Sequence, residues 1–196
     1  MPPIQKIANA TQRTPSRAWL VVSPWVLLLL LAMGAQGQER ADDREAKGAY
    51  LYQFGGYVQW PNSAFARPDS PVVIAVAGAD GLYEQLVQSV SGRTLGRRPV
   101  SARRLQRGEA LAGIHMLFIG NGAGAWRTEL LAQARKLPVL VVTESERGLP
   151  PGSAINFTVV DKRLRFDVSL DAAEANGLKL GALLLSAARQ VVGKTP

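Results

Sequence analysis

The chain has 196 residues, of which 23 are Lys or Arg and 15 are Asp or Glu, giving a formal net charge of +8, with one His and no Cys. With 47% hydrophobic and 19% charged residues it has the composition of a folded protein, and its length favours a single domain. The composition excludes collagen, a Cys-ligated zinc module and a disulfide-stapled miniprotein.

The first 37 residues have the pattern of a secretory signal peptide. Residues 1–17 carry three basic side chains and no acidic one, and an apolar run over 18–33 follows. That run is shorter than the roughly 20 residues that a transmembrane helix needs, which favours a cleaved signal over a retained anchor. Ala35-Gln36-Gly37 supplies small residues for cleavage. Removing 37 residues and three positive charges leaves 159 residues with a net charge of +5, whose first stretch, 38–44, we expect to be disordered.

A helix is predicted from residue 45 to about residue 59. Tyr50, Phe54 and Tyr57 follow the i, i+4, i+7 spacing that puts three aromatic rings on one helix face. This stripe is more typical of a core contact than of a ligand site. Trp60 precedes a proline, which disfavours helical geometry there, and its ring suits either role.

The middle of the chain alternates predicted strands and helices, which indicates parallel pairing through crossovers. Three short apolar runs are typical of strands buried on both faces, and one longer run of a partly exposed strand. The strands are expected at Val72–Ala77, Met116–Ile119, Val139–Val142 and Arg97–Leu105, and the helices through Leu82–Val87 and Trp126–Ala134.

The last quarter changes to a period-two pattern. Apolar and polar residues alternate over Ile155–Val160 and again over Arg163–Val168, which predicts an antiparallel hairpin with one solvated face. Asp161-Lys162 between them lacks Gly, so we expect a loop longer than two residues. A helix is predicted from about Gly181 to Val192. The fold class is therefore α/β: a single domain with a mixed, mostly parallel sheet flanked by helices, ending in an antiparallel hairpin and a helix.

A glycine-rich turn, Gly120-Asn121-Gly122-Ala123-Gly124, follows a predicted buried strand and opens a helix. In that context backbone N–H groups can receive a phosphate, and Glu144 at the end of the next strand is the acid that would take a ribose hydroxyl. The spacing is G-x-G-x-G rather than G-x-G-x-x-G, however, and an exported protein meets little nicotinamide cofactor. We therefore favour a plain turn and expect no cofactor.

Six arginines lie between residues 93 and 107. Nucleic acid would use such a patch for phosphate contacts, but no aromatic residues are interleaved and the export signal removes that partner, so we expect no nucleic acid. A solvated strand face is the favoured interpretation. The alternative is an anion patch at Arg97, Arg98 and Arg103, because Arg holds carboxylates and phosphates bidentately.

Arg163 and Arg165 share one face of the hairpin with Asp167. Two interpretations stay open, a ligand pocket and a cross-strand ladder of ion pairs. His115 is the only histidine, so neither a His-rich metal site nor a Ser-His-Asp triad can be built elsewhere. We expect His115 to be structural and the protein to have no catalytic residue and no metal.

Two blocks of the chain resemble the signature blocks of the YfiR family of periplasmic proteins, in the order and separation found there. The resemblance covers about residues 45–193. The blocks are Ala46–Phe54 running to Val58-Gln59-Trp60-Pro61, and Ile155-Asn156-Phe157 with Arg163–Asp167 and Leu170–Ala173.

The resemblance implies a periplasmic, non-enzymatic regulator. Such a protein is a homodimer that binds the periplasmic sensor domain of an inner-membrane diguanylate cyclase of the YfiN type, lowering cyclic-di-GMP and biofilm formation. An alternative is a periplasmic module that binds a small ligand and serves another membrane sensor or transporter. The absence of Cys excludes the disulfide control seen in the family. The implied ligand or partner contacts are Arg163, Arg165 and Phe166, with Asp167, Trp60 and Gln190 as further candidates.

Overall fold

The structure is a computed structural model that describes residues 42–193. The predicted signal peptide, 1–37, lies outside the described residues. Residues 42–44, at the end of the segment predicted to be disordered, instead belong to a helix over 42–57. Within residues 42–193, no helix is both long enough and apolar enough to cross a bilayer.

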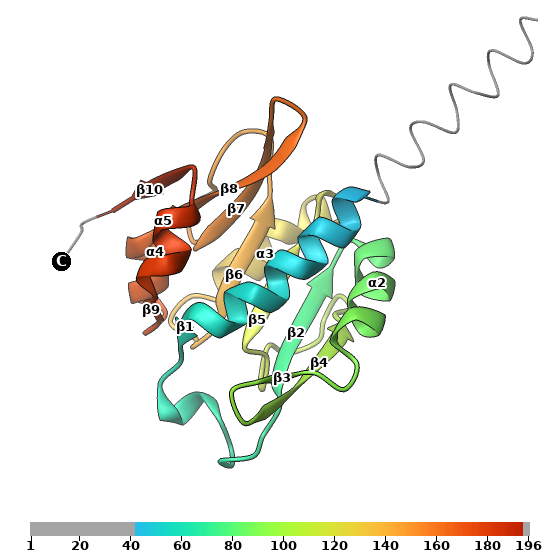
Figure 1. The fold of residues 1–196 in the computed structure, drawn as a ribbon, viewed down its shortest axis with the longest axis vertical. Coiled ribbons are helices and arrows are strands. Elements are labelled where there is room, and N and C mark those ends of the chain that lie inside the picture. Colours follow the sequence, from blue (N-terminus) through green and yellow to red (C-terminus); the bar gives the residue numbers. More distant parts are fainter. Residues whose placement is uncertain (1–41, 194–196) are drawn as a thin grey trace, which may run out of the picture. The chain divides into compact units, whose positions relative to one another are not determined.

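An eight-stranded sheet forms the centre of the domain, in the order β10-β8-β7-β6-β5-β2-β4-β3 (Figure 1). The predicted mixed, mostly parallel sheet is confirmed, since β4, β2, β5, β6 and β7 pair in parallel. β8 pairs antiparallel with β7, β3 pairs antiparallel with β4, and β10 is parallel to β8. The strands of this sheet are β2 (Val72–Ala77), β3 (Thr94–Leu95), β4 (Arg98–Arg104), β5 (Met116–Ile119), β6 (Leu140–Glu144), β7 (Ile155–Val160), β8 (Arg163–Ser169) and β10 (Gln190–Val192).

Helices cover both faces of this sheet (Figure 1). On one, here called the aromatic face, Ile74 and Val76 of β2 pack in a cluster with the 42–57 helix and α2. On the other, the α3 face, Ala75 and Ala77 pack with α3. The described helices after residue 57 are the 3-10 turns η1 (Asn62–Ala64) and η2 (Asn121–Ala123), and α2 (Asp80–Val90), α3 (Trp126–Gln133), α4 (Leu170–Ala175) and α5 (Ala182–Ala187).

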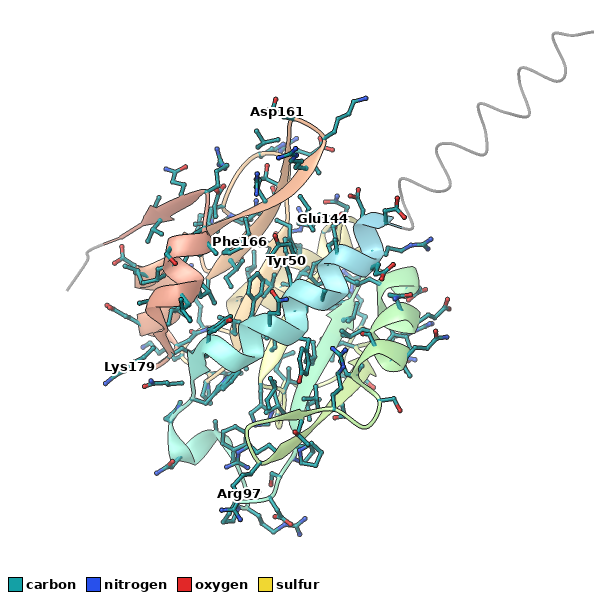
Figure 2. All side chains as sticks on the ribbon, in the orientation of Figure 1. Tyr50, Arg97, Glu144, Asp161, Phe166 and Lys179 are labelled. Atoms are coloured by element: carbon teal, nitrogen blue, oxygen red, sulfur yellow. The ribbon has the colours of Figure 1, made fainter. Side chains whose placement is uncertain are left out.

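Four aromatic rings join the first helix to the hairpin. Tyr50 and Phe54 of the helix meet Phe157 of β7 and Phe166 of β8, with ring centroids 4.9–5.9 Å apart (Figure 2). Each such pair contributes about 0.5–1.5 kcal/mol beyond its buried area. The predicted core stripe therefore holds for Tyr50 and Phe54. Tyr57 is 40% exposed, because the helix ends there and the chain enters β1 (Val58–Gln59), which pairs with β9 (Lys179–Leu180).

The prediction of one helix from Gly181 to Val192 is wrong in its second half. α5 ends at Ala187, and Gln190–Val192 forms β10 beside β8. Arg189 explains the change, since its backbone N–H donates to the carbonyl of Phe166 at 2.8 Å and its guanidinium binds the Asp167 carboxylate. These tertiary bonds outweigh a local helical pattern.

The prediction of a hairpin loop longer than two residues is also wrong. β7 ends at Val160 and β8 begins at Arg163, so Asp161 and Lys162 alone make the turn, with φ angles of 49° and 58°. Two-residue turns with positive φ at both positions match the right-handed twist of paired strands. Asp adopts this backbone region more readily than Lys does, so the strain falls mainly on Lys162.

Candidate functional site

The glycine-rich turn after β5 lies against the loop that follows β2. The chain leaves β2 toward β4 on one side and reaches β5 on the other, which makes these strand ends a topological switch point, the usual ligand position in such folds. Here Gly122 N–H donates to the Gly78 carbonyl at 3.0 Å, and a Cβ on Gly120 would stand 2.7 Å from that same oxygen. The glycines thus serve close contact between the loops, which favours the plain turn over a phosphate site.

A charged network occupies the carboxyl ends of β5 and β6. The Glu144 carboxylate accepts hydrogen bonds from Lys47 Nζ at 2.6 Å and from Asn121 Nδ2 at 2.8 Å. Arg127 donates to Asn121 Oδ1 at 2.9 Å and to the Glu144 carbonyl at 3.2 Å. Glu144 therefore links the first helix to the sheet, and both of its carboxylate oxygens already have partners within the domain. This disfavours the role of accepting a ribose hydroxyl. Sequence reasoning missed this partner, because Lys47 and Glu144 are 97 positions apart.

A cavity of about 420 Å³, the hairpin cavity, opens beside this network on the aromatic face. It is bounded by both blocks that carried the resemblance, since Lys47 belongs to the first and Phe157 and Leu164 to the second. Figure 2 shows Glu144 close to the start of the first helix. Its lining includes three acids and three apolar side chains, Asp43, Glu144, Glu146, Phe157, Val159 and Leu164.

Arg163 and Arg165 lie exposed on the α3 face of the hairpin. β-strand alternation places them with Asp167, as predicted, but Asp167 pairs with Arg189. Within residues 42–193, no acidic side chain reaches either of the two guanidinium groups within 4.0 Å. The described residues therefore form no ladder of ion pairs here, and the two arginines are available to an outside partner.

Asp167 is buried and holds the base of the hairpin in place. It is 3% exposed, and it receives bonds from Arg189 Nε at 2.7 Å and Nη2 at 2.6 Å. These bonds raise the pKa of Arg189. Beside Asp167, the fully buried Asn156 accepts from the Thr143 hydroxyl at 2.9 Å and donates to the Ser145 carbonyl at 3.0 Å. Sequence reasoning missed Arg189, whose role depends on a contact 22 positions away.

The other hairpin candidates occupy different environments. Phe166 is 2% exposed inside the aromatic cluster. Its side chain therefore helps to position the hairpin and is not available for contact with a ligand or partner. Gln190 is exposed on β10, opposite Asp167 in the strand register. Trp60 lies by the amino end of the central strand β5, where its Nε1 donates to the His115 carbonyl at 3.1 Å. The structure therefore does not bring Trp60 together with the hairpin.

Most of the arginine-rich segment is used within the domain. Arg98 donates to the carbonyls of Arg67 and Ser70 at 3.1 and 3.0 Å and lies 3.6 Å over the Phe65 ring. Arg103 pairs with Glu109 at 3.0 Å. Arg97 is exposed, at the end of the molecule opposite the Asp161 turn (Figure 2). These contacts favour the solvated strand face over an anion patch.

His115 is buried, at 3% exposure, between two backbone partners. Its Nδ1 accepts from the Val73 N–H at 3.2 Å, so the neutral ring carries its proton on Nε2 and donates to the Ala64 carbonyl at 3.1 Å. Burial lowers the pKa of His115, the charge of Arg98 adds to that shift, and the Ala64 bond opposes it. The structural role predicted for this residue agrees with these contacts. In residues 42–193, no cluster of three or more His, Cys, Asp or Glu side chains is placed to hold a metal ion.

Comparison with protein families supports the resemblance seen in the two blocks. A family model described as YfiR/HmsC-like matches residues 44–189, most of the chain. The match contains the four aromatic rings, the charged network around Glu144 and the Asp167–Arg189 pair.

Proposed function

The chain belongs to the YfiR/HmsC-like family, and from this premise we propose that it restrains an inner-membrane diguanylate cyclase from the periplasm. It acts there as a homodimer that binds the cyclase's periplasmic sensor domain and holds the enzyme inactive. The result is less cyclic-di-GMP and less biofilm. The proposal includes cleavage of residues 1–37 and assigns the protein no catalytic residue.

The observation that supports this proposal most strongly is the pair of unpartnered arginines on the hairpin. Arg163 and Arg165 are two residues apart on one strand face, which separates them by about 7 Å along the strand. Guanidinium groups bind carboxylates in a planar, bidentate manner. An acidic surface on the sensor domain fits this pair, and the contact between the buried Asp167 and the exposed Arg189 holds the strand in place before the partner arrives.

Repression needs only a difference in affinity between two sensor conformations. Binding the inactive conformation about 5.5 kcal/mol more tightly moves the equilibrium from almost all active to almost all inactive. The protein therefore needs no chemistry of its own.

The test joins a cellular readout to a binding measurement. Deleting the gene while leaving the cyclase intact should raise cyclic-di-GMP, and unchanged levels would contradict the proposal. In vitro, the double variant Arg163→Ala/Arg165→Ala should bind the isolated sensor domain at least about tenfold more weakly than the unmodified protein, because it loses two charge-assisted contacts. Arg97→Ala is the matched control, since it removes an exposed arginine at the other end of the domain and should change affinity less than about twofold.

A second candidate function is that of a small-ligand module, which the hairpin cavity favours. Calorimetry against aromatic amino acids and nucleotides separates the two functions. A ligand whose heat of binding disappears in Lys47→Ala, which removes a cation that lines the hairpin cavity, supports the module. A protein that binds the sensor domain and none of these compounds supports the repressor.

A further inference from the structure

A second cavity, here called the arginine cavity, lies on the α3 face between α3 and the loop over 145–152. Its volume of about 510 Å³ is within the range of small-molecule sites. It is separate from the exposed hairpin arginines. The residues that matter to its chemistry are Arg127, Arg135, Arg147, Leu131, Leu149 and Pro150.

Every charged side chain that lines the arginine cavity is cationic. Arg135 and Arg147 are exposed, and among the described residues neither has an acidic partner within 4.0 Å. Arg127 is half-buried and donates from Nη2 to three oxygens, while its Nε is buried without an acceptor. By contrast, Arg103 and Arg107 each pair with a glutamate. Like charges that line one cavity repel one another, and a bound anion relieves that repulsion.

The loop that forms one wall of the cavity has a defined shape. Gly148 and Gly152 have φ angles of 87° and 88°, which favour glycine, and Pro150-Pro151 restricts the backbone between them. The Ser153 N–H closes a turn onto the Pro150 carbonyl at 3.0 Å. At the other end, the carbonyl of Ser145 is held by Asn156 at 3.0 Å. A wall fixed in this way binds a ligand at a lower ordering cost.

We propose that the arginine cavity binds a small organic anion, with a carboxylate or phosphate group between Arg135 and Arg147 and an apolar body against Leu131, Leu149 and Pro150. The two arginines supply the planar donor pairs that such groups accept. The apolar wall gives an anion that carries a hydrocarbon body an advantage over an inorganic one. Arg127, fixed by its backbone acceptors, adds a constant positive charge behind the site.

The test uses phenylphosphate and benzoate as probes in isothermal titration calorimetry, on the chain after removal of residues 1–37. Both probes are expected to bind, with benzamide, the neutral analogue of benzoate, and inorganic phosphate each at least about tenfold weaker. Arg135→Gln/Arg147→Gln should weaken phenylphosphate at least about tenfold, because it removes both anion contacts. The thermal midpoint of that variant without ligand should stay unchanged, since neither side chain has an acidic partner inside the domain.

Arg163→Gln/Arg165→Gln is the matched control, because it removes the same charge from the hairpin, and it should change phenylphosphate affinity less than about twofold. The proposal is overturned if neither probe binds at millimolar concentration. Equal losses in the two double variants would also overturn it, since they would indicate general charge attraction. Equal affinity for phenylphosphate and inorganic phosphate would remove the role of the apolar wall and with it the proposed ligand class.

Discussion

At the carboxyl ends of β2 and β5 two glycine-rich loops touch through their backbones, whereas the carboxyl end of β6 has a cavity on each face. Both places lie along the same edge of one sheet. Short glycine turns close the first, and at the second a helix-free connection, 145–154, leaves α3 and the hairpin partly uncovered. The comparison shows that the switch point is a favoured ligand position only when its loops leave room there.

The largest effect is expected at the closed end. Gly78 has a φ of 66°, and a Cβ there would stand 2.1 Å from the backbone nitrogen of Ala123. Gly78→Ala should therefore lower the free energy of unfolding by about 3–4 kcal/mol, measured in urea. Gly96→Ala is the control, because Gly96 has a φ of 59° and open space around it, and it should cost about 1–2 kcal/mol. Equal costs would mean that contact between the loops contributes nothing.

The next effect concerns the buried Asn156, which holds the start of the loop over 145–152 that forms one wall of the arginine cavity. Asn156→Ala removes the acceptor of the Thr143 hydroxyl and the donor to the Ser145 carbonyl, and it leaves a small void. We expect a loss of about 2–3 kcal/mol in unfolding free energy and weaker phenylphosphate binding, since the loop loses its anchor. Thr158→Ala, two positions along the same strand face, should cost less than about 1 kcal/mol. Unchanged phenylphosphate binding in Asn156→Ala would mean that the arginine cavity does not depend on the hydrogen bonds of Asn156.

A smaller effect of opposite sign is expected at the hairpin tip. Lys162 has a φ of 58°, which glycine adopts without strain. Lys162→Gly should raise the free energy of unfolding by about 1 kcal/mol in the same urea assay. Asp161→Gly should raise it less, because Asp tolerates this region better. A loss of stability in Lys162→Gly would argue against the two-residue turn.

The smallest effect is expected at His115, by the amino end of β5, and it depends on pH. Burial lowers the pKa of His115 in the folded state. The unfolded chain therefore binds a proton first, and stability present above pH of about 6.5 is lost as the pH falls through the folded-state pKa. Thermal unfolding between pH 7 and 5 should show this decline, and His115→Gln should flatten it. Glu109, whose pKa is lowered chiefly by the Gln106 backbone hydrogen bond, acts only at lower pH.

Local patterns predicted most of the fold, because strands such as β2 and β5 are short apolar runs that can be recognised in the sequence. Two errors had physical causes that no local pattern contains. β10 forms because Arg189 binds the Asp167 carboxylate and the Phe166 carbonyl. The two-residue turn forms because its match to the twist of the paired strands compensates the backbone strain at Lys162.

The candidate site was harder to predict than the fold. Alternation was enough to place Arg163 and Arg165 on one hairpin face. The ion pairs of Asp167 and Glu144 depend on contacts between segments that are distant in the sequence. The same holds for the arginine cavity, which both Arg135 and Arg147 line. Residue type alone did not separate the arginines used inside the domain, such as Arg98, from those left free.

The ion pair between Asp167 and Arg189 also makes the position of the hairpin depend on a segment 22 residues further along the chain. Without Arg189 the Asp167 carboxylate has no cationic partner, and a carboxylate left unpaired in the interior costs several kcal/mol. β10 therefore locks the hairpin through Arg189, and a chain that lacks β10 presents Arg163 and Arg165 on a strand that is no longer fixed.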